Sequence, residues 1–256
     1  MNNFFSFKRF SLLLIKHSAE HYRTYLMSIG VLAGVMVLGG SFIFYMIPGP
    51  MDAGFQTALY AVLMLIAGCI FASTVFADMG DKRKAIPALS LPASTFEKYL
   101  VGWLYSYLVF IVVFTAVFYV VLLSLISLKH WPGHNNEVFS IFQDRFSIVF
   151  IIFSLLHSIS MYGAVVFEKL HFIKIGFAFF ISYALLIICN TFFIKSITGL
   201  AITPAIPFGL LNFSERGTYY NIAPGYEQSL WVFAVMAVVV LLFWIATYFR
   251  LKEKQV

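Results

Sequence analysis

Two histidines, His17 and His21, lie four positions apart with Glu20 between them. On a helix the two imidazoles would share one face and could hold a metal ion, and the His-x-x-Glu-His spacing occurs in one class of zinc peptidases. Glu20 falls beside a row of basic residues, and no distant acidic ligand stands out. We therefore predict a solvated polar face here and no metal site. A second pair, His130 and His134, is interrupted by Pro and Gly and predicts an external turn.

His157 and Asn190 are polar residues within long apolar segments, and they form a candidate intramembrane polar site. An ionisable side chain at that depth is costly and by default suggests a function. A neutral imidazole bonded to a neighbouring helix would satisfy His157 equally well, and Ser154, Ser158 and Ser160 lie close to it in the sequence. We favour this structural role for His157 and interhelical hydrogen bonding for Asn190.

Two kinds of chemistry are missing from the sequence. It contains no Gly-x-x-x-x-Gly-Lys-Ser/Thr motif, so the chain does not bind and hydrolyse ATP by that route. Its long apolar segments carry no Asp or Glu that could relay a proton or a sodium ion, which weakens the case for an ion-coupled transporter. We expect no cofactor in this chain and no enzymatic activity of its own.

Six stretches without any Asp, Glu, Lys or Arg position these residues. About 20 apolar residues in a helix span the ~30 Å hydrocarbon core of a bilayer, and each stretch is at least 20 residues long. The composition, 61% hydrophobic and 11% charged, agrees with this. We predict an all-α polytopic membrane protein with six transmembrane helices in a single domain, 1–256. The six stretches are 25–47, 55–77, 99–128, 146–167, 175–194 and 229–249.

The basic residues predict the orientation. Thirteen of the 17 Lys and Arg residues lie before the first stretch, after the second, after the fourth or after the sixth, all on one side of the membrane. Short basic loops stay in the cytoplasm, so we expect both chain ends there. The net charge of +6 then reflects this orientation and contact with anionic lipid, and we expect no nucleic-acid partner.

Residues 3–23 predict an amphipathic helix on the membrane surface before the first span. Arg9, Lys16 and Arg23 recur every seven residues and form an interfacial basic stripe. An apolar face with a basic back is typical of a helix that lies in the interface. The alternative is a positively charged flank that only fixes the orientation. The residues of the apolar face are Phe4, Phe7, Phe10, Leu14 and Tyr22.

The segment 78–98 predicts a cytoplasmic loop with a short element near 81–89 and a sharp break before the third span. Ser94 and Glu97 have the spacing of a capping box, in which the serine accepts from the amide three residues on and the glutamate reaches back. Pro92 disfavours a helix at Leu91, so a new helix is expected to begin at the capping box.

The segment 195–228 predicts a long external loop. It contains three prolines and four glycines, and its first part, 197–211, is apolar apart from two threonines. An apolar run broken by proline fits a re-entrant or interfacial hairpin better than a solvated loop.

This pattern resembles the membrane (permease) subunit of a bacterial type-2 ABC exporter. The order of surface helix, six spans and capped loop is similar, and the most specific match is the Leu-Pro-Ala-Ser-x-x-Glu-Lys segment at 91–98. The resemblance implies a separate ABC ATPase subunit and a second permease subunit, identical or different, in the bacterial inner (cytoplasmic) membrane. It also implies that 197–211 is the external re-entrant hairpin and that the surface helix contacts the ATPase.

The resemblance further implies that the segment 81–89 is the coupling element that docks into the ATPase. Its basic residues would make electrostatic contacts and its two larger apolar side chains would be the buried anchors. The implied coupling residues are Asp81, Lys82, Arg83, Lys84, Ile86 and Leu89.

Two other classes of function stay open at this point. One is a secondary transporter or a membrane scaffold that works without an ATPase. The other, less favoured, is a membrane-embedded enzyme that uses His157 or the pair His17 and His21.

The orientation can be tested with single cysteines. Because the basic residues lie mainly on one side, a cysteine at Gly133 or Tyr219 should react with an impermeant thiol reagent added outside intact cells. A cysteine at Lys84 should react only after the cells are opened. Labelling at Lys84 in intact cells would reverse the orientation.

Overall fold

The computed structural model describes residues 5–47, 49, 51–80, 93–128, 137–142, 146–167, 170–215, 218–223 and 225–254. Six helical stretches of this part of the chain are long and apolar enough to cross a membrane, so the predicted polytopic helical architecture is confirmed at that level. The helices are α1 (Phe7–Met46), α2 (Ala53–Gly80), α4 (Thr95–Trp103), the π-helical segment η1 (Leu104–Val109), α5 (Phe110–Leu128), α6 (Phe146–Val166), α7 (His171–Thr198) and α8 (Tyr226–Glu253).

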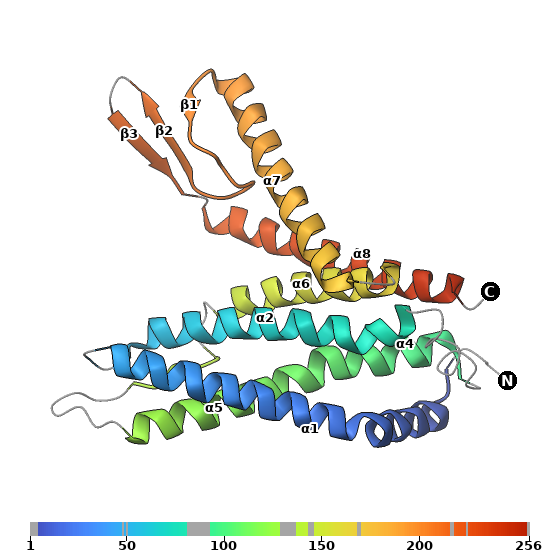
Figure 1. Ribbon diagram of the computed structural model, residues 1–256. Helices are drawn as coiled ribbons and strands as arrows, with labels where there is room; N and C mark the ends of the chain where they lie inside the picture. Colours follow the sequence, from blue (N-terminus) through green and yellow to red (C-terminus); the bar gives the residue numbers. More distant parts are fainter. Residues whose placement is uncertain are drawn as a thin grey trace.

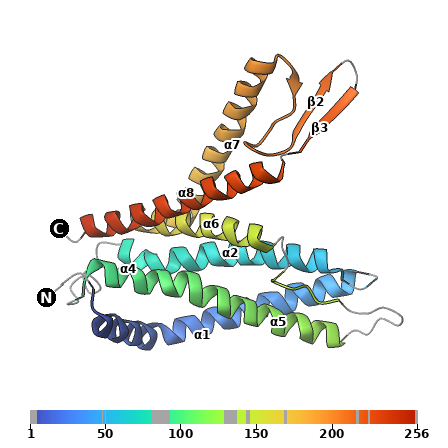
Figure 2. The ribbon, with the colours of Figure 1, turned by 180° about the vertical axis from the view of Figure 1, so that it is seen from behind.

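Helix α6 lies at the centre of the bundle. It packs against α2, α7 and α8, while α1 packs against α4 and α5 (Figure 1). The most apolar part of α6 is 50% buried within the described chain, compared with 6% in α1 and in α7 and 11% in α8, so α1, α7 and α8 are the outer helices. The start of α1 and the end of α8 lie at the same end of the bundle (Figures 1 and 2).

An aromatic core holds α2, α5 and α6 together. Tyr60 of α2 is fully buried and meets Phe114 and Phe118 of α5 edge to face, with ring centroids 5.2 and 5.1 Å apart. Its hydroxyl lies 2.7 Å from that of Thr115, which satisfies the one polar atom it brings into the core. Aromatic pairs of this geometry add about 0.5–1.5 kcal/mol to the burial of their surface.

The buried side chain of Gln56 fixes the segment before α6 onto the start of α2. Its amide nitrogen donates to the carbonyls of Met51 and Glu137, at 2.8 and 2.7 Å. Its amide oxygen accepts from the backbone N–H of Phe139 at 3.1 Å, and the Phe139 ring enters the aromatic core. Through these bonds, Gln56 holds the Phe139 ring of the segment before α6 in the aromatic core.

Helix α1 runs without a break from Phe7 to Met46. The predicted interfacial helix 3–23 is therefore helical from Phe7 onward, but it is continuous with the first span instead of separate from it. Its first turns, in the darkest blue, lie at an angle to the rest of α1 (Figures 1 and 2). Its position on the membrane surface stays a prediction.

The predicted external loop 195–228 has a different structure from the one expected. Helix α7 continues to Thr198 and ends at Gly199, whose φ of 67° suits glycine in a helix cap. A three-stranded antiparallel sheet follows, in the order β1 (Ala201–Ile202), β2 (Leu211–Glu215) and β3 (Thr218–Ile222). The bundle is helical as predicted, and only this small sheet was not expected.

The strands β2 and β3 pair along their whole length, and an aromatic pair across them stabilises the hairpin. Phe213 lies opposite Tyr220, and their rings stack with centroids 5.2 Å apart, a cross-strand pair that favours a hairpin. In Figure 1 the sheet lies at the far end of α7, which leaves the bundle at a steep angle. The apolar, proline-broken character that suggested a membrane hairpin belongs to the β1–β2 connection.

Candidate functional site

The predicted capping box is present at the start of α4. The Ser94 hydroxyl accepts from the backbone N–H of Glu97 at 3.2 Å, and Glu97 Oε2 accepts from the backbone N–H of Ser94 at 2.9 Å. The third span therefore begins with a rigid turn directly after the cytoplasmic loop of the predicted topology.

The second carboxylate oxygen of Glu97 binds the start of α1. Oε1 accepts from the backbone N–H of Ser6 at 2.6 Å and from Arg9 Nε and Nη2 at 3.3 and 3.1 Å. Glu97 is fully buried, and the Arg9 side chain is 36% exposed. We call Ser6, Arg9, Ser94 and Glu97 the Glu97 junction. It joins two segments 88 residues apart, and the sequence prediction contained only its Ser94–Glu97 half.

The predicted basic stripe is therefore split. Arg9 faces the protein and pairs with Glu97, because a buried carboxylate needs a counter-charge. Lys16 forms an exposed pair with Glu20 at 3.5 Å, one turn along α1. Arg23 is exposed, donates to the Tyr22 hydroxyl at 2.9 Å and lies over that ring.

The histidines of α1 lie against aromatic side chains. The rings of His17 and His21 stack 4.4 Å apart, and His17 Nε2 lies 2.6 Å from the hydroxyl of Tyr25. Tyr105 of η1 packs on His17 at 4.8 Å, and its hydroxyl is hydrogen-bonded to that of Ser18. The face predicted as solvated is thus half-buried between α1 and η1. In the part of the chain that the structure describes, no group of three or more His, Cys, Asp or Glu side chains could hold a metal ion.

Both ring nitrogens of His157 have partners. The Trp244 indole N–H donates to Nδ1 at 3.4 Å, and Nε2 lies 2.9 Å from the hydroxyl of Ser106. An indole nitrogen can only donate, so Nδ1 accepts, and in the neutral ring Nε2 carries the proton and donates to Ser106. Ser106 in turn contacts the carbonyl of Trp103 at 3.4 Å. These hydrogen bonds satisfy both ring nitrogens of a neutral, fully buried His157, as the structural role that we favoured requires.

The bonds of His157 connect three elements. Ser106 belongs to η1, His157 to α6 and Trp244 to α8. Tyr107 adds a bond of 2.6 Å from its hydroxyl to that of Ser154, and its ring meets the rings of His157 and Trp244 edge to face. We call Ser106, Tyr107, Ser154, His157 and Trp244 the His157 cluster. The π-helical turn presents both Ser106 and Tyr107 to α6, and such turns occur often at functional sites.

Asn190 binds a loop and not a neighbouring helix. Its side-chain amide donates to the carbonyl of Ala205 at 2.9 Å, and the hydroxyl of Thr191 accepts from the Ala205 N–H at 3.0 Å. Ala205 is buried, so the β1–β2 connection folds back onto α7 at this point. The expected interhelical role of Asn190 is thus corrected, because its side chain bonds to the backbone of the connection between β1 and β2.

The predicted coupling segment and the pair His130 and His134 lie outside the described residues. Comparison of the chain with protein-family models, with curated proteins and with solved structures gave no match. A function therefore has to be argued from the apolar helices, the Glu97 junction and the His157 cluster.

The Glu97 junction should contribute more stability than an exposed ion pair. Glu97→Ala removes the acceptor of two backbone N–H groups and of Arg9, and should cost about 3 kcal/mol. Arg9→Ala leaves the backbone bonds intact and should cost about 1–2 kcal/mol. Lys16→Ala, the control in an exposed pair, should cost less than about 1 kcal/mol. Thermal unfolding of the purified variants gives the order, and equal losses for Arg9→Ala and Lys16→Ala would contradict the junction.

Substitutions at His157 separate a structural from a functional role. His157→Gln keeps one donor and one acceptor and should retain nearly normal stability. His157→Leu leaves the Trp244 N–H and the Ser106 hydroxyl without this partner and should cost about 1–3 kcal/mol. Thermal unfolding of the purified variants is measured. A His157→Gln protein as unstable as His157→Leu would contradict the hydrogen-bonded structural role.

Proposed function

We propose that this chain is the permease subunit of an ATP-driven ABC transporter of the bacterial inner membrane, an exporter in which a separate subunit hydrolyses ATP. The Glu97 junction is the observation that carries this proposal. It fastens the start of α1 to the start of α4, directly after the segment to which the resemblance assigns ATPase docking.

The junction supplies a mechanical path from that segment into the membrane. Residues 81–92 connect α2 to the capped start of α4, and Glu97 connects α4 to α1. A displacement of the segment by an ATPase would therefore move three helices together. Switching by rigid movement of packed helices is the general mode by which membrane halves alternate access.

The exposed apolar surface of α7 is an argument for a second permease subunit. Helix α7 leaves the bundle, and its most apolar window is only 6% buried (Figure 2). Large apolar side chains such as Phe180, Phe192 and Phe193 are more than 60% exposed along it. A partner permease would cover part of this surface, and lipid would cover the rest.

The contacts of His157 favour this proposal over an ion-coupled transporter or a membrane-embedded enzyme. A proton relay or a catalytic base needs a nitrogen that can reach a substrate or water. Here both nitrogens are bonded within the bundle, and the ring is fully buried.

Copurification with the ATPase tests the proposal. Ile86→Asp or Leu89→Asp should abolish association with an ATPase subunit while the protein still inserts, because buried anchors dominate such interfaces. Lys84→Ala should weaken it modestly, and more at low salt. Ile206→Asp, the same change at an exposed position of the opposite face, is the control and should have no effect. Unchanged copurification of the Ile86 and Leu89 variants would remove the coupling assignment.

A further inference from the structure

Two histidines and two tyrosines join the first half of α1 to the third span. The rings of His17 and His21 stack 4.4 Å apart, and Tyr105 of η1 packs on His17 at 4.8 Å. Tyr25 of α1 stacks on Tyr105 with ring centroids 5.5 Å apart. We call His17, His21, Tyr25 and Tyr105 the His17 seam. Its rings belong to two elements that are far apart in the sequence, so the seam forms only when α1 lies against η1.

Hydrogen bonds between neutral groups accompany these ring contacts. The Ser18 hydroxyl donates to the carbonyl of Leu14 at 2.8 Å, so in its hydrogen bond with Tyr105 it accepts and the phenol donates. The Tyr25 hydroxyl lies 2.6 Å from His17 Nε2. A neutral imidazole can accept a hydrogen bond, whereas both nitrogens of a protonated ring are donors. The seam is thus built for uncharged rings.

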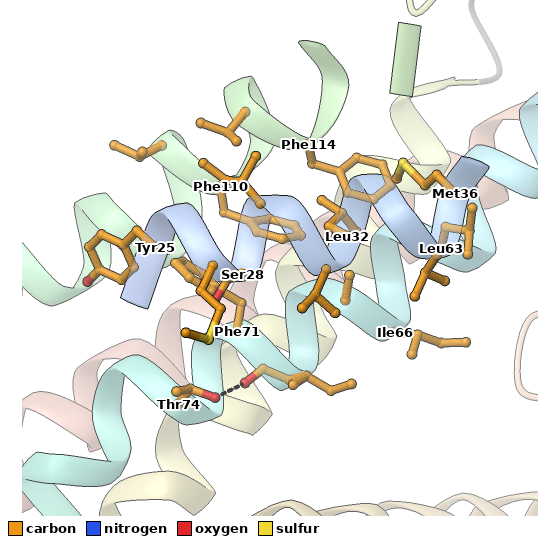
Figure 3. Close-up of a pocket in the computed structure, with 18 of the residues that line it drawn as sticks. Tyr25, Ser28, Leu32, Met36, Leu63, Ile66, Phe71, Thr74, Phe110 and Phe114 are labelled. Carbon is orange, nitrogen blue, oxygen red and sulfur yellow. Dashed lines mark hydrogen bonds between the residues drawn. The ribbon is translucent and has the colours of Figure 1, made fainter. Parts of the chain in front are cut away.

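Few other contacts hold this part of α1. The most apolar part of α1 is only 6% buried. A cavity of about 460 Å³ between α1 and α2 begins at Tyr25 (Figure 3), where Phe71 of α2 contacts the Tyr25 ring at 5.6 Å. Towards the start of α1, the next attachment is the Glu97 junction at Arg9. Loss of the seam would therefore free the part of α1 that lies between Arg9 and Tyr25.

The charges that act on His17 come from its own helix. His21 lies one turn further along α1, and Glu20, which pairs with the exposed Lys16, lies beside it. Two imidazolium ions whose rings stack 4.4 Å apart would repel each other strongly in a half-buried site. The stacked pair therefore disfavours a proton on His17.

Among the described residues of the neighbouring elements, the groups near His17 are uncharged. The titratable group that faces it from η1 is the phenol of Tyr105. Helix α5 carries no charged residue. The charged residues of α4 are Glu97 and Lys98, and Glu97 pairs with Arg9, two turns nearer the start of α1 than His17.

These surroundings make the seam sensitive to acid. His17 lies before the uncharged stretch 25–47, in the part of α1 that is predicted to lie on the membrane surface. Burial of the ring, and then the neighbouring His21, lower the pKa of His17 from 6.5 to about 4, against an opposite effect of Glu20. In an open α1 the ring regains its ordinary pKa. Below pH 6.5 the open form therefore binds a proton that the closed form does not, and the seam loses stability until about pH 4. Above pH 6.5 it keeps its full stability.

We propose that the His17 seam is an acid-sensitive latch, which holds the first half of α1 on the third span and releases it when an imidazole nitrogen of His17 takes up a proton from the aqueous phase. Only hydrogen bonds and ring contacts break in this step. The released part of α1 stays attached at the Glu97 junction and continues into the first span at Tyr25. This inference rests on contacts within the chain and does not depend on an ATPase.

Distances between two spin labels test the latch. The labels are placed on Ile15→Cys of α1 and Leu108→Cys of η1, positions that are 63% and 46% exposed, in a full chain that carries Cys69→Ala and Cys189→Ala. Above pH 6.5 the purified protein should show one short distance. Between pH 6.5 and about 4, a second and longer distance should grow several-fold per pH unit.

A variant that cannot titrate gives the decisive comparison. His17→Gln can still bond to the Tyr25 hydroxyl but binds no proton, so it should keep the short distance at every pH. His171→Gln, at the start of α7, is the matched histidine control and should respond as the parent does. Equal growth of the long distance in His17→Gln and in the parent, or no growth in the parent at about pH 4, would refute the latch.

Thermal unfolding gives a second measurement that needs neither labels nor cysteine substitutions. Lowering the pH from 6.5 to about 4 should lower the Tm of the native chain more than that of His17→Gln, because only the native chain gains a proton at this position on unfolding. Other groups that titrate in this range lower both values alike. Parallel curves for the two proteins would contradict the role of His17.

Discussion

A carboxylate that is removed from water must be given hydrogen-bond donors and a positive charge, and the end of the bundle where α1 and α4 begin is organised around that requirement. Glu97 accepts from the backbone of Ser94, from the backbone of Ser6 and from Arg9. Each bond fixes a different piece of chain, so one side chain sets the start of the third span and the entry of the first. Helix α1 buries little of its most apolar part, and this attachment adds to its packing on α4 and α5.

The same need for hydrogen-bond partners applies to polar side chains in the middle of the apolar helices. In hydrocarbon a polar group without a partner costs several kcal/mol, so hydroxyls, imidazole and indole pair with one another or with helix carbonyls. Ser28 and Thr74 donate to carbonyls one turn earlier in their own helices. His157 has no such local solution and is satisfied by residues from two other helices. Within the described residues, no buried side-chain nitrogen or oxygen is left without a hydrogen bond.

The features that could be predicted from the sequence are the ones set by local chemistry. A run without charge fixes a span, so the predicted 99–128 and 146–167 fall almost entirely within the helical stretches Thr95–Leu128 and Phe146–Val166. The capping box at Ser94 depends on residues three apart, and it is present.

The features that the sequence could not predict depend on distant partners or on competition between two local structures. Arg9 kept the seven-residue spacing of a solvent-facing stripe, and only the fold brings Glu97 to it. One signal was available: a capping glutamate has a second oxygen that needs donors. In the segment 195–228, prolines and apolar residues concealed the β2–β3 pairing, which consists of two five-residue strands.

The π-helical turn at Leu104–Val109 changes the phase of the third span. One extra residue in a turn shifts all following side chains by about 100° around the axis relative to a continuous α-helix. Within the turn, Tyr105 contacts α1, while beyond it Phe110, Phe114 and Phe118 follow one another every four residues along the aromatic core. A helical wheel drawn through the whole segment would therefore assign its second half to the wrong face. An aligned sequence that lacks the extra residue would need a gap at this turn for its side chains to keep the same faces.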